Sequence, residues 1–388
     1  MTVSRACYCN RYEVQSALDF RPGVDVNGAT DRAMMSAAED IEGSLKRVFY
    51  PSDHTVFFDW PSQGTTQGGV YADPWKLPLG ENDLVCPTQL VSGGVTIPLN
   101  QVFVYPFENP AKHRPYYWQL ELDRSFSVQF GNNAQTPQYA IGATGTWGYG
   151  ADADPAGSLA AEVASAGAMT VTVSDGALCG PGDVIILGYG RGEPPFPGSQ
   201  PHAGSIAPFL GERLLVADVA AADTGLAQSG PGCSTASDSD NALSVTGAGS
   251  LNAGEVVVLD QEQMLVQQVV NGVAAVRRAW AGTALQPHSD AEVFAFRQLS
   301  VVRSVLGSVY SGPYDSGAAV VRHRVPELVR DLAIGLAGVQ LVSEGTAYAR
   351  TMASGDAAAP APGAGLGWKW KAAMTRHGRG GKARHRGV

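Results

Sequence analysis

Residues that could do chemistry stand singly along this chain. The histidines of the main body are His54, His113, His202, His288 and His323. A catalytic or metal-binding histidine needs partners at a suitable spacing, and the sequence has no zinc-protease, esterase or phosphate-loop motif. We therefore interpret these histidines as surface or structural residues, and we predict neither an enzyme nor a bound cofactor.

Two acidic pairs are the next candidates, because carboxylate oxygens bind cations. Asp152 stands with Asp154, and Asp238 stands with Asp240. Neither pair belongs to the twelve-residue pattern of a calcium loop, so solvated turns are the favoured interpretation. The alternating glycines at 188–192 lead into a proline-rich stretch, which cannot open the helix of a dinucleotide-binding motif. No metal or nucleotide site is predicted from these residues.

The cysteines are odd in number, and only Cys7 and Cys9 lie close together. Without a second pair at zinc-ligand spacing, free thiols in a reducing cytoplasm are expected. The first residues lack the apolar segment of a signal peptide, and no stretch is long enough to cross a bilayer. We therefore expect neither secretion by a signal peptide nor insertion into a membrane.

Charge is distributed unevenly along the sequence. The formal net charge is −9, yet no acidic residue follows Asp356, and the final stretch carries seven Lys and Arg residues. Without those seven bases, the charge of the remainder is −16. One interpretation is a soluble acidic body with an unstructured end. The other is a tail that docks on a partner protein or on nucleic acid. The residues assigned to docking are Trp368, Lys369, Trp370, Lys371, Arg376 and Arg379.

Two amphipathic helices are predicted to position the rest of the chain. The first spans about residues 28–47, where apolar residues recur at three- and four-residue steps before Pro51 ends the helix. The second spans about residues 325–350 and has Pro326 at its first position. The apolar stripes include Met34, Ile41 and Leu45 in the first helix, and Leu332 and Leu336 in the second.

The chain between these helices reads as short strands. Its 47 glycines and 24 prolines favour many turns. The residues before 151 predict a small sheet laid against the first helix. The predicted strands are 56–60, 84–90, 94–98, 103–105, 118–122, 127–130 and 140–149.

Beyond residue 154 the chain repeats itself. Residues 171–187 align with 243–259 without a gap, and residues 212–216 align with 262–266. A second similarity relates residues 276–283 to 301–308. Two related β-modules are therefore predicted, forming either a barrel or a sandwich.

The predicted fold class is α+β, with a small helical core, an associated β-sheet and an inserted, duplicated all-β region. The predicted domains are 1–154 for the first part of the core, 155–322 for the β-modules, 323–352 for the late helix that completes the core, and 353–388 for a flexible basic tail.

Residues 29–51, Phe57-Phe-Asp-Trp-Pro61 and Thr144-Gly-Thr-Trp-Gly-Tyr149 together resemble the core of a phage protein family. The family is that of the head-to-tail connector, or adaptor, proteins of long-tailed double-stranded DNA bacteriophages. Residues 325–334 are similar to the helix that resumes the core in that family. The resemblance covers about half of the chain, and the short family members lack the duplicated region.

This resemblance implies a structural protein of the virion neck, assembled in the host cytoplasm. It implies a ring, usually of twelve subunits, that lies between portal and tail and lets genomic DNA pass without sequence-specific binding. The implied partners are the portal protein, head-tail stopper or tail terminator proteins, and further copies of the chain, with the C-terminal segment binding the portal. Met34, Ile41, Leu45, Leu332 and Leu336 are then assigned to packing in the ring.

An alternative function remains open at this point. The duplicated β-modules are also similar to small β-domains of phage tail proteins. A tail or baseplate component whose β-modules bind a surface or a glycan is therefore the second hypothesis.

Overall fold

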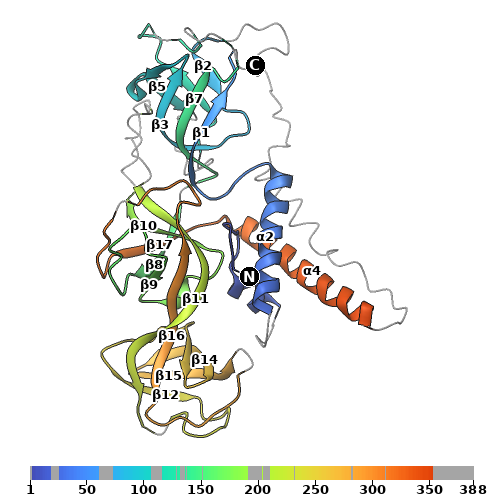
Figure 1. Cartoon of the computed structure of the whole chain (residues 1–388), viewed down its shortest axis with the longest axis vertical. Helices are drawn as coiled ribbons and strands as arrows, with labels where there is room; N and C mark the ends of the chain where they lie inside the picture. The colour runs from blue at the N-terminus through green and yellow to red at the C-terminus, as the bar shows by residue number, and fades with distance from the viewer. Residues whose placement is uncertain are drawn as a thin grey trace.

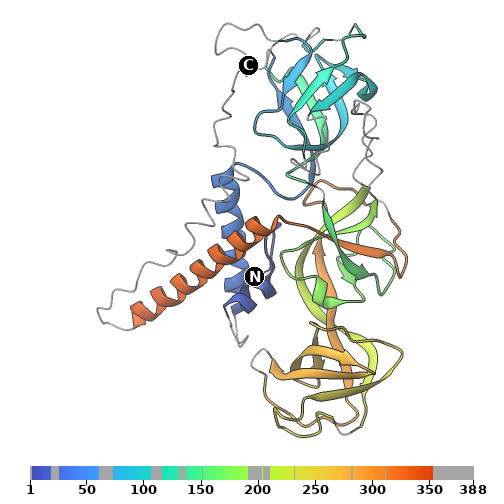
Figure 2. The same cartoon turned by 180° about the vertical axis from the view of Figure 1, so that it is seen from behind.

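The computed structural model shows a small β-lobe, a group of helices and an elongated β-barrel lobe (Figures 1 and 2). Strands make up 42% of the structure and helices 18%, so the fold is mixed but mostly β. The described residues are 2–18, 26–60, 73–105, 116–127, 129–131, 136, 138–150, 152–190, 203, 210–230, 232–280, 283–310 and 312–352.

The helices lie together at one side of the molecule. α1 (Arg11–Ala17) begins with a capping box, in which Asn10 accepts from the backbone N–H of Glu13 and the Glu13 carboxylate accepts from that of Asn10. α2 (Val26–Leu45) and α4 (Glu327–Met352) pack through their apolar sides. Only the first part of α4 reaches α2, and the rest projects away from the body (Figure 1).

The β-lobe is built from two small antiparallel sheets. One has the strand order β1-β7-β3-β4, and the other has the order β2-β6-β5. Side chains of both sheets, among them Leu84, Leu120 and Trp147, form a single core. The elements are β1 (Ser52–Phe58), β2 (Lys76–Pro78), β3 (Leu84–Ser92), β4 (Val95–Ile97), the 3-10 turn η2 (Leu99–Gln101), β5 (Val102–Tyr105), β6 (Gln119–Leu122) and β7 (Ile141–Trp147).

The β-lobe has a hydrophobic core of its own, so the predicted small helical core with an associated β-sheet is not confirmed. The helices share their hydrophobic cluster with the N-terminal segment and with Leu215 of the barrel lobe, whereas the β-lobe has its own cluster. The two sheets bury each other's apolar faces, so neither is left to cover a helix. The junction after the end of α2 combines an ion pair with aromatic packing: Arg47 Nε lies 2.6 Å from Asp83 Oδ2, and the ring centroids of Phe49 and Tyr149 lie 5.3 Å apart.

The barrel lobe contains two six-stranded rings placed end to end (Figure 1). Barrel 2 has the order β11-β12-β15-β14-β13-β16, and β16 returns to pair with β11. Barrel 1 has the order β8-β17-β10-β11-β16-β9, and a bridge between Leu159 and Val173 closes it. The elements are β8 (Ala153–Ser158), β9 (Thr170–Thr172), η3 (Gly176–Leu178), β10 (Val184–Gly190), β11 (Leu210–Gln228), β12 (Ala242–Gly247), β13 (Val256–Leu259), β14 (Glu262–Val270), β15 (Val273–Trp280), β16 (Glu292–Val302) and β17 (Ala319–His323).

Barrel 2 is inserted into barrel 1, because the long strands β11 and β16 run through both. The two barrels share one topology and one register. In barrel 1, Val184 pairs with Leu215. In barrel 2, Val256 pairs with Leu265, and these are the positions that the sequence repeat makes equivalent. The predicted duplication therefore corresponds to two barrels and not to a sandwich.

Element boundaries from the sequence agree with the structure to within a few residues for both long helices. The strand predicted at 127–130 is wrong. Phe130 lies at a turn there, and its backbone N–H donates to the Pro74 carbonyl at 2.9 Å. The barrel lobe begins at Ala153, slightly before the predicted boundary.

Candidate functional site

The most concentrated polar cluster lies inside barrel 2 and is built around Glu262, the first residue of β14. Neither Glu262 nor Arg278 of β15 exposes its side chain to solvent. Arg278 Nε donates to Glu262 Oε1 at 3.0 Å, and Nη2 donates to Oε2 at 2.6 Å. The backbone N–H groups of Ala279 and Gln286 complete the ring of donors at 3.0 and 2.9 Å. A buried carboxylate so fully hydrogen-bonded holds the barrel together and has no lone pair left for catalysis.

His288 belongs to the same cluster. Its Nδ1 lies 2.7 Å from Asp260 Oδ2, and its Nε2 lies 3.0 Å from Glu262 Oε2. Burial opposes ionisation of Glu262, but the hydrogen bonds from Arg278, from the two backbone N–H groups and from His288 outweigh it and lower the pKa of Glu262 to about 2. The two carboxylates face opposite sides of the imidazole ring, so they do not converge on one point as metal ligands would.

Barrel 1 has an equivalent ion pair with fewer bonds. Glu212, the counterpart of Glu262, accepts from Arg303 Nη1 at 3.0 and 3.2 Å. Arg303 Nε donates to the Ala168 carbonyl at 2.7 Å. Burial raises the pKa of Glu212, in contrast to its counterpart in barrel 2. The recurrence of the pair at equivalent positions of both barrels favours a structural role for each.

A second pair of equivalent carboxylates stabilises two equivalent turns, one before β10 in barrel 1 and one before β13 in barrel 2. Asp183 accepts from the backbone N–H of Gly180 at 2.9 Å, and Glu255 accepts from that of Asn252 at 2.8 Å. Arg297 also binds Glu255 through two bonds of 2.7 Å. These carboxylates too act as structural acceptors.

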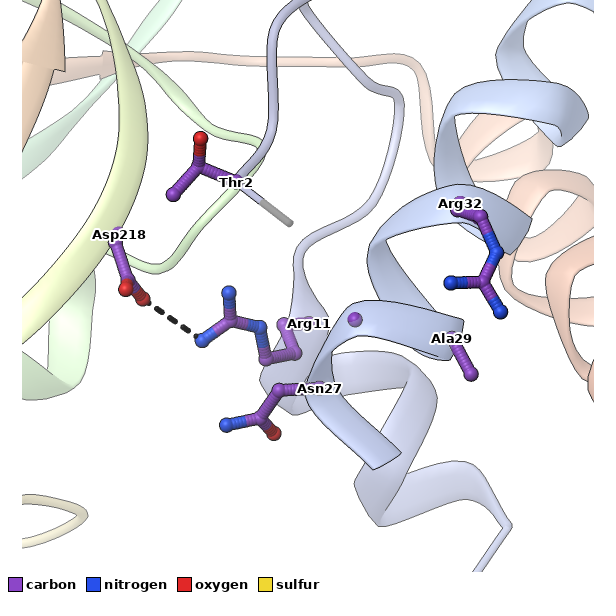
Figure 3. Close-up of a pocket in the computed structure, with 7 residues that line it drawn as sticks. Thr2, Arg11, Asn27, Ala29, Arg32 and Asp218 are labelled. Carbon is purple, nitrogen blue, oxygen red and sulfur yellow. Dashed lines mark hydrogen bonds and ion pairs between the residues drawn. The ribbon is translucent and has the colours of Figure 1, made fainter. Parts of the chain in front are cut away.

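An open pocket of about 480 Å³ lies between the N-terminal segment, the start of α2 and β11 (Figure 3). Arg11 points into it but is held by two carboxylates: Nε and Nη2 donate to Asp31 at 2.9 Å each, and Nη1 donates to Asp218 at 2.9 Å. Arg11 therefore ties α1 to α2 and β11. The lining residues are Thr2, Arg11, Asn27, Gly28, Ala29, Arg32 and Asp218.

The histidines singled out from the sequence occupy separate places. His54 lies on the exposed side of β1. His323 is buried, its Nε2 lies 2.7 Å from the Phe49 carbonyl oxygen, and burial lowers its pKa to about 4. Among the described histidines, only His288 joins a polar cluster, and the sequence analysis did not predict that cluster. His113 and His202 lie outside the described residues.

The acidic pairs form ordinary turns and ion pairs. Asp240 accepts from the backbone N–H groups of Cys233 and Thr235 at 2.9 Å each. Asp154 lies 4.0 Å from the Arg324 guanidinium. Across the described ranges, no group of three His, Cys, Asp or Glu side chains is placed to hold a metal ion.

The residues assigned to interfaces divide into two groups. Met34, Ile41, Leu45 and Leu332 are fully buried within one chain, and Leu336 is partly buried against the same cluster. These side chains pack α2 against α4, so a contact between subunits would have to use other residues of the helices. The predicted docking residues Trp368, Lys369, Trp370, Lys371, Arg376 and Arg379 lie outside the described residues.

Comparison with protein-family models, with curated proteins and with solved structures finds no match to this chain. In the part of the chain that the structure describes, no helix combines the length and the apolar character needed to cross a membrane.

Proposed function

We propose that this protein is a structural component of a phage virion, a head-to-tail adaptor that forms a ring between portal and tail. The observation that carries the proposal is the course of α4. Its first part packs on α2, and the rest projects from the body (Figure 2). In the sequence, the basic segment of residues 353–388 follows this helix directly. Such a helix is suited to carry a docking segment toward a partner.

The composition of α4 supports contact with neighbouring copies. Residues 332–343 carry no charge, although only one side of this stretch faces the other helices. Ile334 and Val339 are partly exposed, and Val342 is 45% exposed. A helix that is apolar on several sides is normally covered on several sides. In the proposed ring, a neighbouring subunit would supply that cover.

The charge of the barrel lobe supports a channel through which DNA passes without being held. No lysine occurs between Lys112 and Lys369. Arg213, Arg278, Arg297 and Arg303 are buried and paired with carboxylates. Among the described residues of the barrel lobe, exposed carboxylates such as Glu162, Asp223 and Asp290 outnumber the exposed guanidinium groups of Arg277 and Arg324, and like charge repels the phosphates of DNA.

Native mass spectrometry of the full chain, alone and with portal protein, tests the proposal. A ring of about a dozen subunits, or a portal complex of matching stoichiometry, is expected. Deletion of residues 353–388 should leave the body folded and abolish portal binding. Val342→Asp should disrupt the ring, whereas Val309→Asp, at an 80% exposed position of the barrel lobe, should not. A stable monomer, trimer or hexamer without affinity for portal would contradict the adaptor function.

One observation favours the alternative of a tail or baseplate component that binds a surface or glycan. Barrel 2 lies at the far end of the molecule from the β-lobe (Figure 1). Its β14–β15 turn presents Val270 and Val273 at 52% and 39% exposure. Binding of the full chain to a glycan array, lost on Val270→Asp, would support this alternative.

A further inference from the structure

β1 is an outer strand of the four-stranded sheet of the β-lobe, and part of its outer edge is open. It pairs with β7 over its whole length without a register shift. The backbone N–H of Asp53 points away from β7 and donates to the Leu306 carbonyl at 2.8 Å. Backbone groups of alternate residues point to the same edge of a strand, so those of Thr55 and Phe57 also point away from β7. Neither residue has a backbone partner there in the described ranges.

The open part of this edge carries none of the features that commonly protect an edge strand. Leu306 and Gly307 cover the edge at Asp53, where a Cβ on Gly307 would lie 1.9 Å from the Asp53 carbonyl oxygen. Beyond them, residues 55–58 read Thr-Val-Phe-Phe, with no charge, no proline and no register shift. Charges, prolines and bulges are the usual protection of an edge. This edge is therefore suited to pair with another strand.

The side chains beside the open edge are uncharged and exposed. Phe57 is 56% exposed, and its ring lies across Gly142, where a Cβ would be 3.3 Å from the ring. Tyr139 is 74% exposed and packs edge-on against the Phe57 ring, with 6.1 Å between the ring centroids. Thr55 and Thr144 share a hydroxyl hydrogen bond of 2.8 Å on the same face. A strand added at the edge would bury part of the Phe57 ring.

The open edge is complementary to itself. With a twofold axis at Val56, Thr55 of one copy lies opposite Phe57 of a second copy, and both residues present their N–H and C=O groups to each other. Each residue can then exchange both of its backbone hydrogen bonds with its counterpart. A twofold pair also uses the open edge of both copies at once, so the assembly closes and does not propagate.

The position of the barrel lobe and the charge of the chain both permit this pairing. β1 enters the β-lobe at Asp53, which contacts Arg213 and Leu306 of the barrel lobe, and it ends at Phe58. Antiparallel strands run in opposite directions, so the two barrel lobes would lie at opposite ends of the strand pair. Each chain has a net charge of −9, so two copies repel each other except where uncharged surfaces meet.

We propose that the open edge of β1 is an interface between two copies of this chain, in which residues 55–58 of each copy pair in antiparallel fashion about Val56. The pairing extends the four-stranded sheet across both chains. It uses a different surface from the α4 contact of the proposed ring, and it does not rest on the adaptor function.

Amide hydrogen exchange of the full-length protein, resolved at single residues, tests this interface. From about 1 μM to about 1 mM protein, the Thr55 and Phe57 amides should become protected by at least about tenfold. Fast exchange at every concentration would overturn the proposal. Protection that does not depend on concentration would also overturn it, because a segment of the same chain would then cover the edge. Protection that requires a different protein would overturn the choice of a second copy.

Thr55→Pro is the decisive variant, because proline removes the outward N–H and is tolerated in an edge strand. The symmetric pair loses this hydrogen bond twice, so the dissociation constant of the dimer, measured by sedimentation, should rise at least about tenfold. The protection of Phe57 should be lost with it. Thr96→Pro is the matched control: it removes an outward N–H from β4, at the opposite edge of the same sheet, and should leave the pairing unchanged.

Thr55→Lys tests the same edge without a change to the backbone. A lysine at the exposed Thr55 position places a charge beside the second strand and should weaken the dimer. Gln89→Lys adds the same charge to the same face of the sheet, but on β3 and away from the edge, and should dimerise like the wild type. A dimer that persists in both Thr55 variants would show that the copies meet elsewhere and would overturn the β1 interface.

Discussion

Replacing Glu262 with Gln should destabilise barrel 2 strongly while keeping the side-chain volume. Each carboxylate oxygen of Glu262 accepts several hydrogen bonds: Oε1 faces Arg278 Nε and the Ala279 N–H, and Oε2 faces Arg278 Nη2, the Gln286 N–H and His288 Nε2. The Gln amide nitrogen, at the position of either Glu262 oxygen, would face N–H donors and could not accept from them. The Arg278 guanidinium would also lose the negative charge that it pairs with. Breaking one side of a buried ion pair costs about 3–5 kcal/mol.

Glu212→Gln in barrel 1 is the matched variant. Glu212 interacts with the Arg303 nitrogen Nη1 at two distances and with the Tyr314 side chain, and the Gln oxygen can keep part of these contacts. Loss of the charge-assisted part of this interaction should cost about 1–3 kcal/mol. The Glu262→Gln variant should therefore be the less stable of the two, by about 2 kcal/mol.

Native-state hydrogen exchange measures this difference locally, because a chain of several lobes need not unfold in one step. Amides of β14 and β15 should lose protection in Glu262→Gln and keep it in Glu212→Gln. Equal loss in both variants, or a loss below about 1 kcal/mol in Glu262→Gln, would show that the count of accepted bonds does not determine the stability of these barrels.

Two further predictions concern the junctions between lobes. Burial lowers the pKa of His323 from 6.5 to about 4, so between these pH values the unfolded chain binds a proton that the folded chain does not bind. The free energy of unfolding should therefore fall as the pH drops from about 6.5 to about 4, and the loss should be about 2 kcal/mol at pH 5. Urea unfolding at about pH 6.5 and at pH 5 should show this loss, and His323→Gln should abolish it. Gly307 and Gly317 both have positive φ angles, +73° and +84°, but a Cβ would lie 1.9 Å from the Asp53 carbonyl oxygen only at Gly307. Gly307→Ala should therefore lower the melting temperature far more than Gly317→Ala, and equal losses would mean that backbone strain alone matters.

Much of the local structure could be predicted from the sequence. The periodicity of 28–47 and 325–350 predicted both long helices, because their apolar stripes follow the helical repeat over several turns. The ungapped match of 171–187 with 243–259 predicted two related modules with equivalent strands. These signals are local, so they can be read without knowing the partners of each segment.

The sharing of β11 and β16 could not be predicted in the same way. Residues 217–222 are rich in alanine and lack the alternation that marks a strand with one buried face. Their place is decided by pairing with residues 295–300, far along the chain. Closure of each barrel likewise depends on contacts between distant segments.

The sequence repeats contain a signal from which the buried ion pairs of the polar cluster could have been predicted. Glu212 and Glu262 occupy equivalent positions of one repeat, and Arg303 and Arg278 occupy equivalent positions of the other. Charged residues that recur within otherwise apolar repeats suggest buried ion pairs. His288 has no counterpart in barrel 1, so the repeat gave no indication of its role.

The insertion of barrel 2 into barrel 1 determines the order in which the lobes can be completed during synthesis. All strand segments of barrel 2 have been made once β16 emerges, whereas barrel 1 still lacks β17. The helices wait longest, because α4, which completes the hydrophobic cluster of α1 and α2, is made last. A nascent chain in which β16 has left the ribosome and β17 has not would therefore carry a closed outer barrel, an open inner barrel and a partly covered α2, and this intermediate is the one most in need of a chaperone.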